Sequence, residues 1–129
     1  MATIRKEVMI ATAPDLVWAA FRDFHAVHER VVRGFVVACE ADGADARRVT
    51  FANGLTAREV LISCDDALRR LAYTATGGRL AHHNGVVEVR GEGAGARVLW
   101  TIDLLPSDMA PAIDAMMEAG AAAMQKTMG

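Results

Sequence analysis

The order of elements can be read outward from residues 96–127, ARVLWTIDLLPSDMAPAIDAMMEAGAAAMQKT. In its first third the apolar side chains alternate, which is the period of a β-strand. Pro106 then stops the strand, and Ser107 is a residue type that favours helix N-caps. Beyond it, apolar side chains recur at helical spacing: Ile113, Met116, Met117, Gly120 and Met124. The stretch predicts a last strand followed by one long helix from Ser107 to about Thr127.

Six further strands and two short helices are predicted upstream. Ala13-Pro14-Asp15 has the residue types that open a helix, and residues 25–32 read as a second, short helical piece. The connectors between strands are short and carry turn residues such as Asn53-Gly54, so neighbouring strands should be antiparallel. The predicted strands are residues 3–12, 34–41, 47–52, 56–65, 69–76, 81–90 and 96–105. We therefore expect an α+β fold in which a curved, seven-stranded antiparallel sheet wraps around the long C-terminal helix.

Composition narrows the class of protein. The 129 residues are 53% hydrophobic and 23% charged, as in a single globular domain spanning residues 1–129. The net charge is -2, whereas proteins that bind nucleic acid through its phosphates are usually basic, so we expect no nucleic-acid partner. We expect no membrane span and no signal peptide. Cys39 and Cys64 lack CxxC spacing and are expected to be buried, free thiols in a cytoplasmic protein.

Short motifs along nearly the whole chain are similar to those of a known superfamily. They are APDLVW at residues 13–18, RVLW at residues 97–100 and LLP at residues 104–106. On these motifs the chain resembles the START/polyketide-cyclase superfamily (SRPBCC), which has the helix-grip fold. HHN at residues 82–84 and WTID at residues 100–103 resemble its small bacterial polyketide cyclase/dehydrase-like branch. The resemblance implies a cavity between helix and sheet, but no single set of catalytic residues.

Strand registers predict which side chains face that cavity. In the last hairpin we pair Val89 with Val98, which turns the apolar parity inward. Continuing this count through the preceding hairpin puts Tyr73 opposite His83. We expect one ligand-binding site made of these and other inward side chains, closed by two residues of the last helix: Arg58, Tyr73, His83, Trp100, Met117 and Gly120.

The fourth predicted strand supplies the charge in this set. A two-residue turn at Asn53-Gly54 pairs Val49 with Arg58. Even-numbered residues of the strand then face inward, so Val60 and Ile62 should lie in the cavity wall beside Arg58. An inward arginine would orient a ligand by its charge, unless it extends to solvent at the rim.

Two pairs of polar side chains are considered for acid–base chemistry in the cavity. His83 is the best candidate acid or base because its ordinary pKa is near neutrality, and Tyr73 is the second candidate. Asn84 and Asp103 are expected to hydrogen-bond across strands on the convex face. In the alternative arrangement, a bulge near Pro106 turns Asp103 inward beside His83.

Neither a metal nor another cofactor is expected. His82 and His83 are adjacent in a strand and point to opposite faces, so they cannot share an ion. His25 and His28 could share a helix face, but no third ligand is visible at a suitable spacing. The glycine-rich residues 91–95 lack the Lys-Ser/Thr of a phosphate-binding loop and should be a hairpin connector.

Three functions remain open from the sequence. The leading hypothesis is a small-molecule binding protein with an apolar cavity for a hydrophobic or aromatic metabolite, polyketide-like or lipid-like. The second is a polyketide cyclase or dehydratase, in which the same cavity orients a flexible substrate and His83 or Tyr73 moves a proton. The third is a protein-interaction or chaperone-regulating module, which would need an exposed apolar groove. Oligomeric state and ligand identity are not encoded in any recognisable motif.

Overall fold

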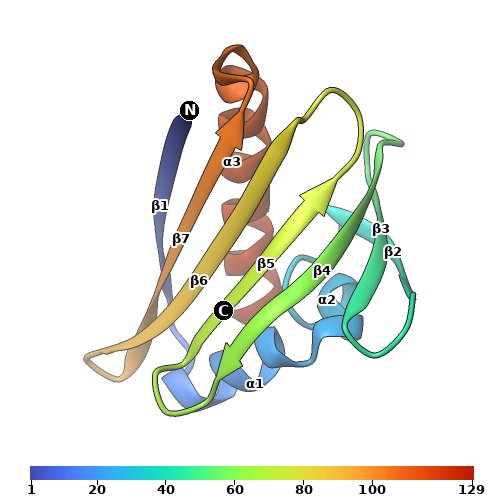
Figure 1. The fold of residues 1–129 in the computed structure, drawn as a ribbon. Helices are drawn as coiled ribbons and strands as arrows, with labels where there is room; N and C mark the ends of the chain where they lie inside the picture. Colours follow the sequence, from blue (N-terminus) through green and yellow to red (C-terminus); the bar gives the residue numbers. More distant parts are fainter.

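A single antiparallel sheet of seven strands forms one layer of the protein, and helices cover its concave face (Figure 1). The computed structural model describes all 129 residues. The strands are β1 (Ala2–Ile10), β2 (Val36–Ala41), β3 (Ala46–Phe51), β4 (Thr56–Asp65), β5 (Arg70–Thr76), β6 (His82–Glu92) and β7 (Gly95–Leu105). Their order across the sheet is β1-β7-β6-β5-β4-β3-β2. The predicted α+β helix-grip architecture is confirmed.

The helices also follow the prediction, with one difference at a helix start. α1 (Pro14–Arg22) begins at Pro14, and a 3-10 turn (Phe24–Ala26) leads into the short α2 (Val27–Arg30). The long helix α3 (Ala110–Met128) is preceded by a 3-10 turn (Ser107–Met109). Ser107 makes no side-chain cap hydrogen bond, so its predicted role as an N-cap is wrong. The chain instead enters α3 through the 3-10 turn, with Pro111 in the first helical turn, where a missing N–H costs nothing.

Lys6 connects β1 to α3 through two ion pairs. This lysine on β1 points inward and reaches two carboxylates of the helix, with Nζ 2.7 Å from Asp114 and 2.6 Å from Glu118. Near the end of the helix, the side-chain amide of Gln125 donates to the carbonyl of Met9. Because α3 packs chiefly on the β1 edge, the concave face of β3 to β6 is left for side chains to enclose.

The last hairpin has the predicted register. Val89 pairs with Val98, His83 with Leu104 and Asn84 with Asp103. In the preceding hairpin Tyr73 pairs with Gly85 instead of His83. That shift of two residues leaves every side chain on its predicted face, because side chains along a strand alternate with a period of two.

The predicted face of β4 is wrong. The register shifts between Leu61 and Ser63, and the extra residue, Ile62, is 60% exposed. A one-residue bulge exchanges the two faces of a strand, so Leu61 and Glu59 face inward in place of Val60 and Arg58. The connection to β3 agrees with this exchange: Thr50 pairs with Thr56, so the loop has an odd number of residues instead of a two-residue Asn53-Gly54 turn.

The two cysteines lie on different strands with β3 between them. Cys39 on β2 is half-buried, and Cys64 on β4 is exposed; both are free thiols. The expectation that both are buried is therefore wrong for Cys64, which lies at the solvent-facing end of β4. None of the helices combines the length and the apolar character needed to cross a membrane.

Candidate functional site

A cavity of about 240 Å³ lies between α3, the α1–α2 segment and the concave face of the sheet. Twenty-two of its thirty lining residues are hydrophobic, so the few polar side chains in the wall stand out. Phe21, Val27 and Val31 of the α1–α2 segment close one end of it. The cavity is the site that the helix-grip arrangement predicts.

The opposite end of the cavity is open. The solvent-exposed lining residues gather in the β3–β4 turn, the β5–β6 loop and the start of α3. These three segments lie at the same end of the molecule (Figure 1). Leu55 in the β3–β4 turn is 59% exposed and Arg79 in the β5–β6 loop is also exposed, so an apolar residue and a cation both border the mouth.

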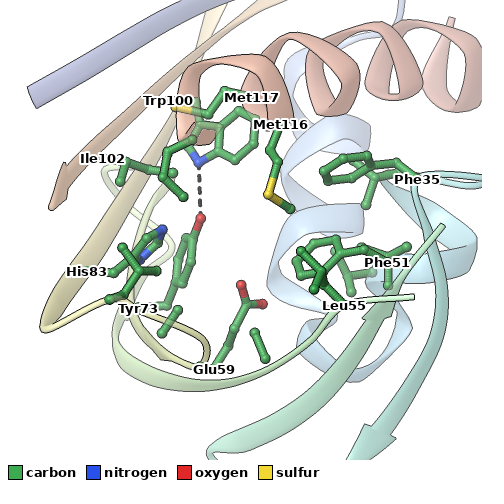
Figure 2. A pocket seen from close by; sticks show the side chains of 18 of the residues that line it. Phe35, Phe51, Leu55, Glu59, Tyr73, His83, Trp100, Ile102, Met116 and Met117 are labelled. Carbon is green, nitrogen blue, oxygen red and sulfur yellow. Dashed lines mark hydrogen bonds between the residues drawn. The ribbon is translucent and has the colours of Figure 1, made fainter. Parts of the chain in front are cut away.

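Tyr73 and Trp100 form a hydrogen-bonded pair in the cavity wall (Figure 2). The Trp100 indole Nε1 donates to the Tyr73 hydroxyl oxygen at 3.1 Å, and both side chains are buried. Burial raises the pKa of Tyr73 well above its ordinary value of 10.0, so the hydroxyl keeps its proton. No acceptor in the protein takes that proton. The hydroxyl is therefore free to donate to a bound molecule.

His83 lies beside this pair. Its ring centroid is 6.0 Å from that of Tyr73, and only 8% of the residue is exposed. Burial lowers the pKa of His83 below 6.5, with a smaller opposing effect from the negative charge of Glu59. The imidazole is thus neutral at pH 7. Its Nδ1 atom is buried without a hydrogen-bond partner, which is uncommon for a polar atom in a protein interior.

A buried ion pair completes the polar wall. The Nε atom of Arg47 donates to Glu59 Oε1 at 2.8 Å, and one terminal nitrogen of Arg47 donates to the carbonyl of Phe24 at 2.8 Å. The guanidinium also stacks on the Phe24 ring, 3.8 Å from its centroid. The charge of Arg47 is therefore already matched, while Glu59 Oε2 has no partner in the protein. The Glu59 carboxylate points into the cavity (Figure 2).

Four of the six predicted site residues line the cavity together: Tyr73, His83, Trp100 and Met117. Arg58 does not, because it lies on the outer face and its Nε atom is 2.8 Å from Asp42. Gly120 lies behind Trp100, where an added Cβ would be 3.1 Å from the indole ring, so it supports the wall without bordering the cavity.

Arg47 and Glu59 are the site residues that sequence reasoning missed. They are cross-strand partners in β3 and β4. The signal that could have found them is a pair of opposite charges at positions that an odd-length turn would place face to face.

The second polar pair stays outside. Asn84 Nδ2 donates to Asp103 at 3.3 Å, and His82 is hydrogen-bonded to the same asparagine. The predicted cross-strand bond on the convex face is confirmed, and the alternative with Asp103 turned inward is wrong. His82 and His83 point to opposite faces, as expected for neighbours in a strand.

Comparisons with known proteins agree with this architecture. Residues 1–129 match the family model described as polyketide cyclase / dehydrase and lipid transport. The protein XoxI from Bacillus cereus has a similar structure, with TM-score 0.84 and 18% identity over 99% of this chain and 96% of that one. A solution structure from Thermobifida fusca has TM-score 0.75 and 26% identity over 98% and 89% of the two chains.

One similar structure has a description that includes a function. The di-domain ARO/CYC protein BexL, from the BE-7585A biosynthetic pathway, has TM-score 0.82 and 17% identity. The match covers 98% of this chain and 46% of BexL. At that identity the likeness concerns the fold. A comparison with curated proteins gives no match.

Proposed function

The chain belongs to the polyketide cyclase / dehydrase and lipid-transport family, and from this premise we propose that it binds a small aromatic molecule carrying a hydroxyl or carbonyl group. The apolar part of the ligand would fill the cavity between α3 and the sheet. Its polar group would meet Tyr73, His83 and Glu59, three polar side chains in a mainly apolar wall.

The observation that carries this proposal is the unused hydrogen-bonding capacity at one side of a largely apolar cavity. The Tyr73 hydroxyl proton, His83 Nδ1 and Glu59 Oε2 all lack partners in the protein. Of these three, His83 Nδ1 is the atom that is fully buried without a partner, and a buried polar atom left unpaired costs about 1–3 kcal/mol. A ligand that pairs even one of them gains both affinity and a fixed orientation.

The size of the cavity indicates the size of the ligand. A cavity of about 150 Å³ holds a benzene molecule. The volume here is about 240 Å³, which suits a molecule of one or two rings. A longer chain would have to leave through the mouth.

The test compares the binding of para-ethylphenol with that of para-ethyltoluene, which has a methyl group in place of the phenol's hydroxyl group. Binding is followed by Trp100 fluorescence in a Trp18→Phe background, since the chain has two tryptophans and Trp18 lies outside the cavity. We expect the phenol to bind about tenfold more tightly, as one additional hydrogen bond predicts. Tyr73→Phe should remove most of that preference. Arg58→Ala, on the outer face, should leave it unchanged.

Two results would contradict the proposal. One is that neither compound changes the fluorescence of Trp100 at its solubility limit. The other is that both compounds bind equally and Tyr73→Phe has no effect, since the polar wall would then play no part in recognition.

His83 supports a second candidate function, proton transfer in a cyclase or dehydratase. Its pKa is lowered by burial, so at pH 7 it is a neutral base, and Nδ1 carries an unused lone pair or proton depending on the tautomer. The expected elementary step breaks a C–H bond next to a ligand carbonyl, with the proton passing to His83 and the electrons to the carbonyl oxygen as an enolate. The Tyr73 hydroxyl would donate to that oxygen.

This second function has its own measurement. An enolisable ring ketone such as β-tetralone is incubated with the protein in D₂O, and deuterium incorporation is followed by NMR. Exchange faster than in buffer that is lost in His83→Gln and kept in Arg58→Ala would support catalysis. Binding of the ketone without any acceleration would leave the protein as a carrier alone.

A further inference from the structure

Three side chains separate the cavity from a second apolar depression on the surface. Phe35, Phe51 and Met116 border both spaces. The depression, here called the outer groove, is otherwise lined by Ala52, Asn53, Ala115 and Ala119. The two phenyl rings are in contact, with centroids 5.3 Å apart and planes inclined at 59°. The partition between the two spaces is therefore one side chain thick.

This partition lies across the cavity from the polar wall. Figure 2 shows Tyr73 and His83 at one side, Phe35, Phe51 and Leu55 at the other, and the Met116 side chain projecting between them from α3. A ligand whose polar group pairs with Tyr73 or His83 therefore points its apolar end toward the partition. Any substituent at that end meets Met116 and the two rings first.

Met116 is the replaceable part of the partition. It is half-buried, and its neighbours on the same side of α3, Ala112, Ala115 and Ala119, are too short to take its place. Of these alanines, Ala115 and Ala119 line the outer groove, and each contributes only a methyl group there. Truncating Met116 would consequently join the cavity to the groove without a large change in packing.

From this arrangement we propose that Met116, together with Phe35 and Phe51, sets the maximum length of ligand that the cavity can enclose. The proposal rests on the proposed binding function, because it concerns the same cavity. Beyond binding itself, the length limit depends on one residue, and a longer ligand has a defined path once the Met116 side chain is removed. The apolar tail would pass between the two phenyl rings and α3 into the outer groove.

A series of para-alkylphenols from propyl to nonyl tests this. In the wild type, affinity should rise about fourfold for each added methylene while the tail is buried, and then stop rising or fall when the tail reaches the partition. We call the chain length at which affinity stops rising the break. In Met116→Ala the break should occur at a tail about two or three methylene groups longer, matching the atoms removed from the methionine. Alanine is the best helix former, so α3 should stay folded.

Met109→Ala is the matched control. Met109 is also half-buried and also lines the cavity, but it does not border the outer groove. Its truncation removes the same atoms, so a general gain in cavity volume would appear equally in both variants. We expect the break in Met109→Ala to stay at the wild-type chain length.

The outcomes separate the two proposals. If the wild type binds the short phenols and affinity continues to rise for the longer ones only in Met116→Ala, both proposals are supported. If the wild type binds the short phenols but Met116→Ala breaks at the same length, or Met109→Ala shifts equally, the length limit is not set by Met116. If no phenol binds any variant, the binding function itself is overturned. A crystal structure of Met116→Ala with nonylphenol should show the tail in the outer groove, and a tail leaving through the mouth would also overturn the inference.

Discussion

The ring of Tyr73 lies across Gly85, its partner residue on the neighbouring strand. A Cβ atom built onto Gly85 would be 2.6 Å from both Cε1 and the hydroxyl oxygen of the tyrosine, a separation that real Cβ atoms do not show. Gly85 therefore creates the space in which Tyr73 can lie flat on the sheet and reach Trp100. One residue without a side chain positions the hydroxyl that we assign to ligand recognition.

Gly85→Ala should displace Tyr73 and break its hydrogen bond to Trp100. We expect a loss of about 1–3 kcal/mol in the free energy of unfolding, as for other overpacked interiors, and at least tenfold weaker binding of para-ethylphenol. Urea unfolding and the fluorescence titration measure the two effects. Gly91→Ala on the same strand is the control, because its added Cβ would meet only Pro14 Cγ, at an ordinary 3.8 Å. Equal effects of the two substitutions would contradict the role of Gly85.

Two arginines that are close in the sheet should differ strongly in their contribution to stability. Arg47→Met leaves the Glu59 carboxylate without its partner in the interior, and such a loss typically costs about 3–5 kcal/mol. Arg58→Met removes an ion pair on the surface, where the cost is about 0–1 kcal/mol. Urea denaturation of the two variants gives the comparison directly.

The double variant Arg47→Met/Glu59→Gln provides a control for this interpretation. If the large loss in Arg47→Met arises from an unpaired charge, neutralising Glu59 should restore part of the stability. Similar midpoints for Arg47→Met and Arg58→Met would mean that the faces of β3 and β4 are not as described.

The difference between these arginines also shows why the sequence predicts the last two strands better than β4. In β6 and β7 charged or polar residues occupy one parity at several positions, among them Glu88, Arg97 and Asp103, so the other parity faces the core once the glycine-rich connector at residues 91–95 fixes the hairpin. The sequence of β4 from Val60 to Ile62 is apolar on both parities. Alternation cannot then choose a face, and a bulge at Ile62 leaves no mark in the residue types.

The wrong prediction for the inward face of β4 affects only the charged residues of the site. Tyr73, His83, Trp100 and Met117 could be predicted to share the cavity because β5, β6, β7 and α3 each have a clear periodicity. Arg47 and Glu59 depend on the length of the β3–β4 loop and on the bulge, which are features of tertiary packing. The partition at Phe35, Phe51 and Met116 depends on how α3 packs over the sheet, which is likewise a feature of tertiary packing.

The two thiols should react at very different rates. Cys64 is exposed, whereas Cys39 is half-buried and burial raises the pKa of its thiol, so less of the reactive thiolate is present. At pH 8 we expect iodoacetamide to modify Cys64 at least about tenfold faster than Cys39. Mass spectrometry of tryptic peptides distinguishes the sites, and Cys64→Ser should abolish the fast phase. Equal rates in the folded protein would contradict the burial of Cys39.

His83 should make the stability of the fold depend on pH in a defined window. Burial lowers the pKa of this side chain in the folded protein below the ordinary 6.5, which the unfolded chain retains. As the pH falls through 6.5, the unfolded chain therefore binds a proton before the folded protein does. The free energy of unfolding should decrease from about pH 6.5 downward, and this contribution should level off below the lowered pKa of the folded state.

Urea unfolding at closely spaced pH values between neutrality and pH 4 measures this slope, with His83→Gln as the test and His82→Gln as the matched control. His82 is exposed on the outer face, so its replacement should leave the slope unchanged, while His83→Gln should flatten it. The carboxyl groups of Asp42 and Asp66 act in a separate window, since their ion pairs and hydrogen bonds lower their pKa values below 3.8. If the slope persists in His83→Gln, it does not come from His83. The pKa of this imidazole would then not be lowered in the folded wild type, and His83 could not be assigned as a neutral base at the cavity wall.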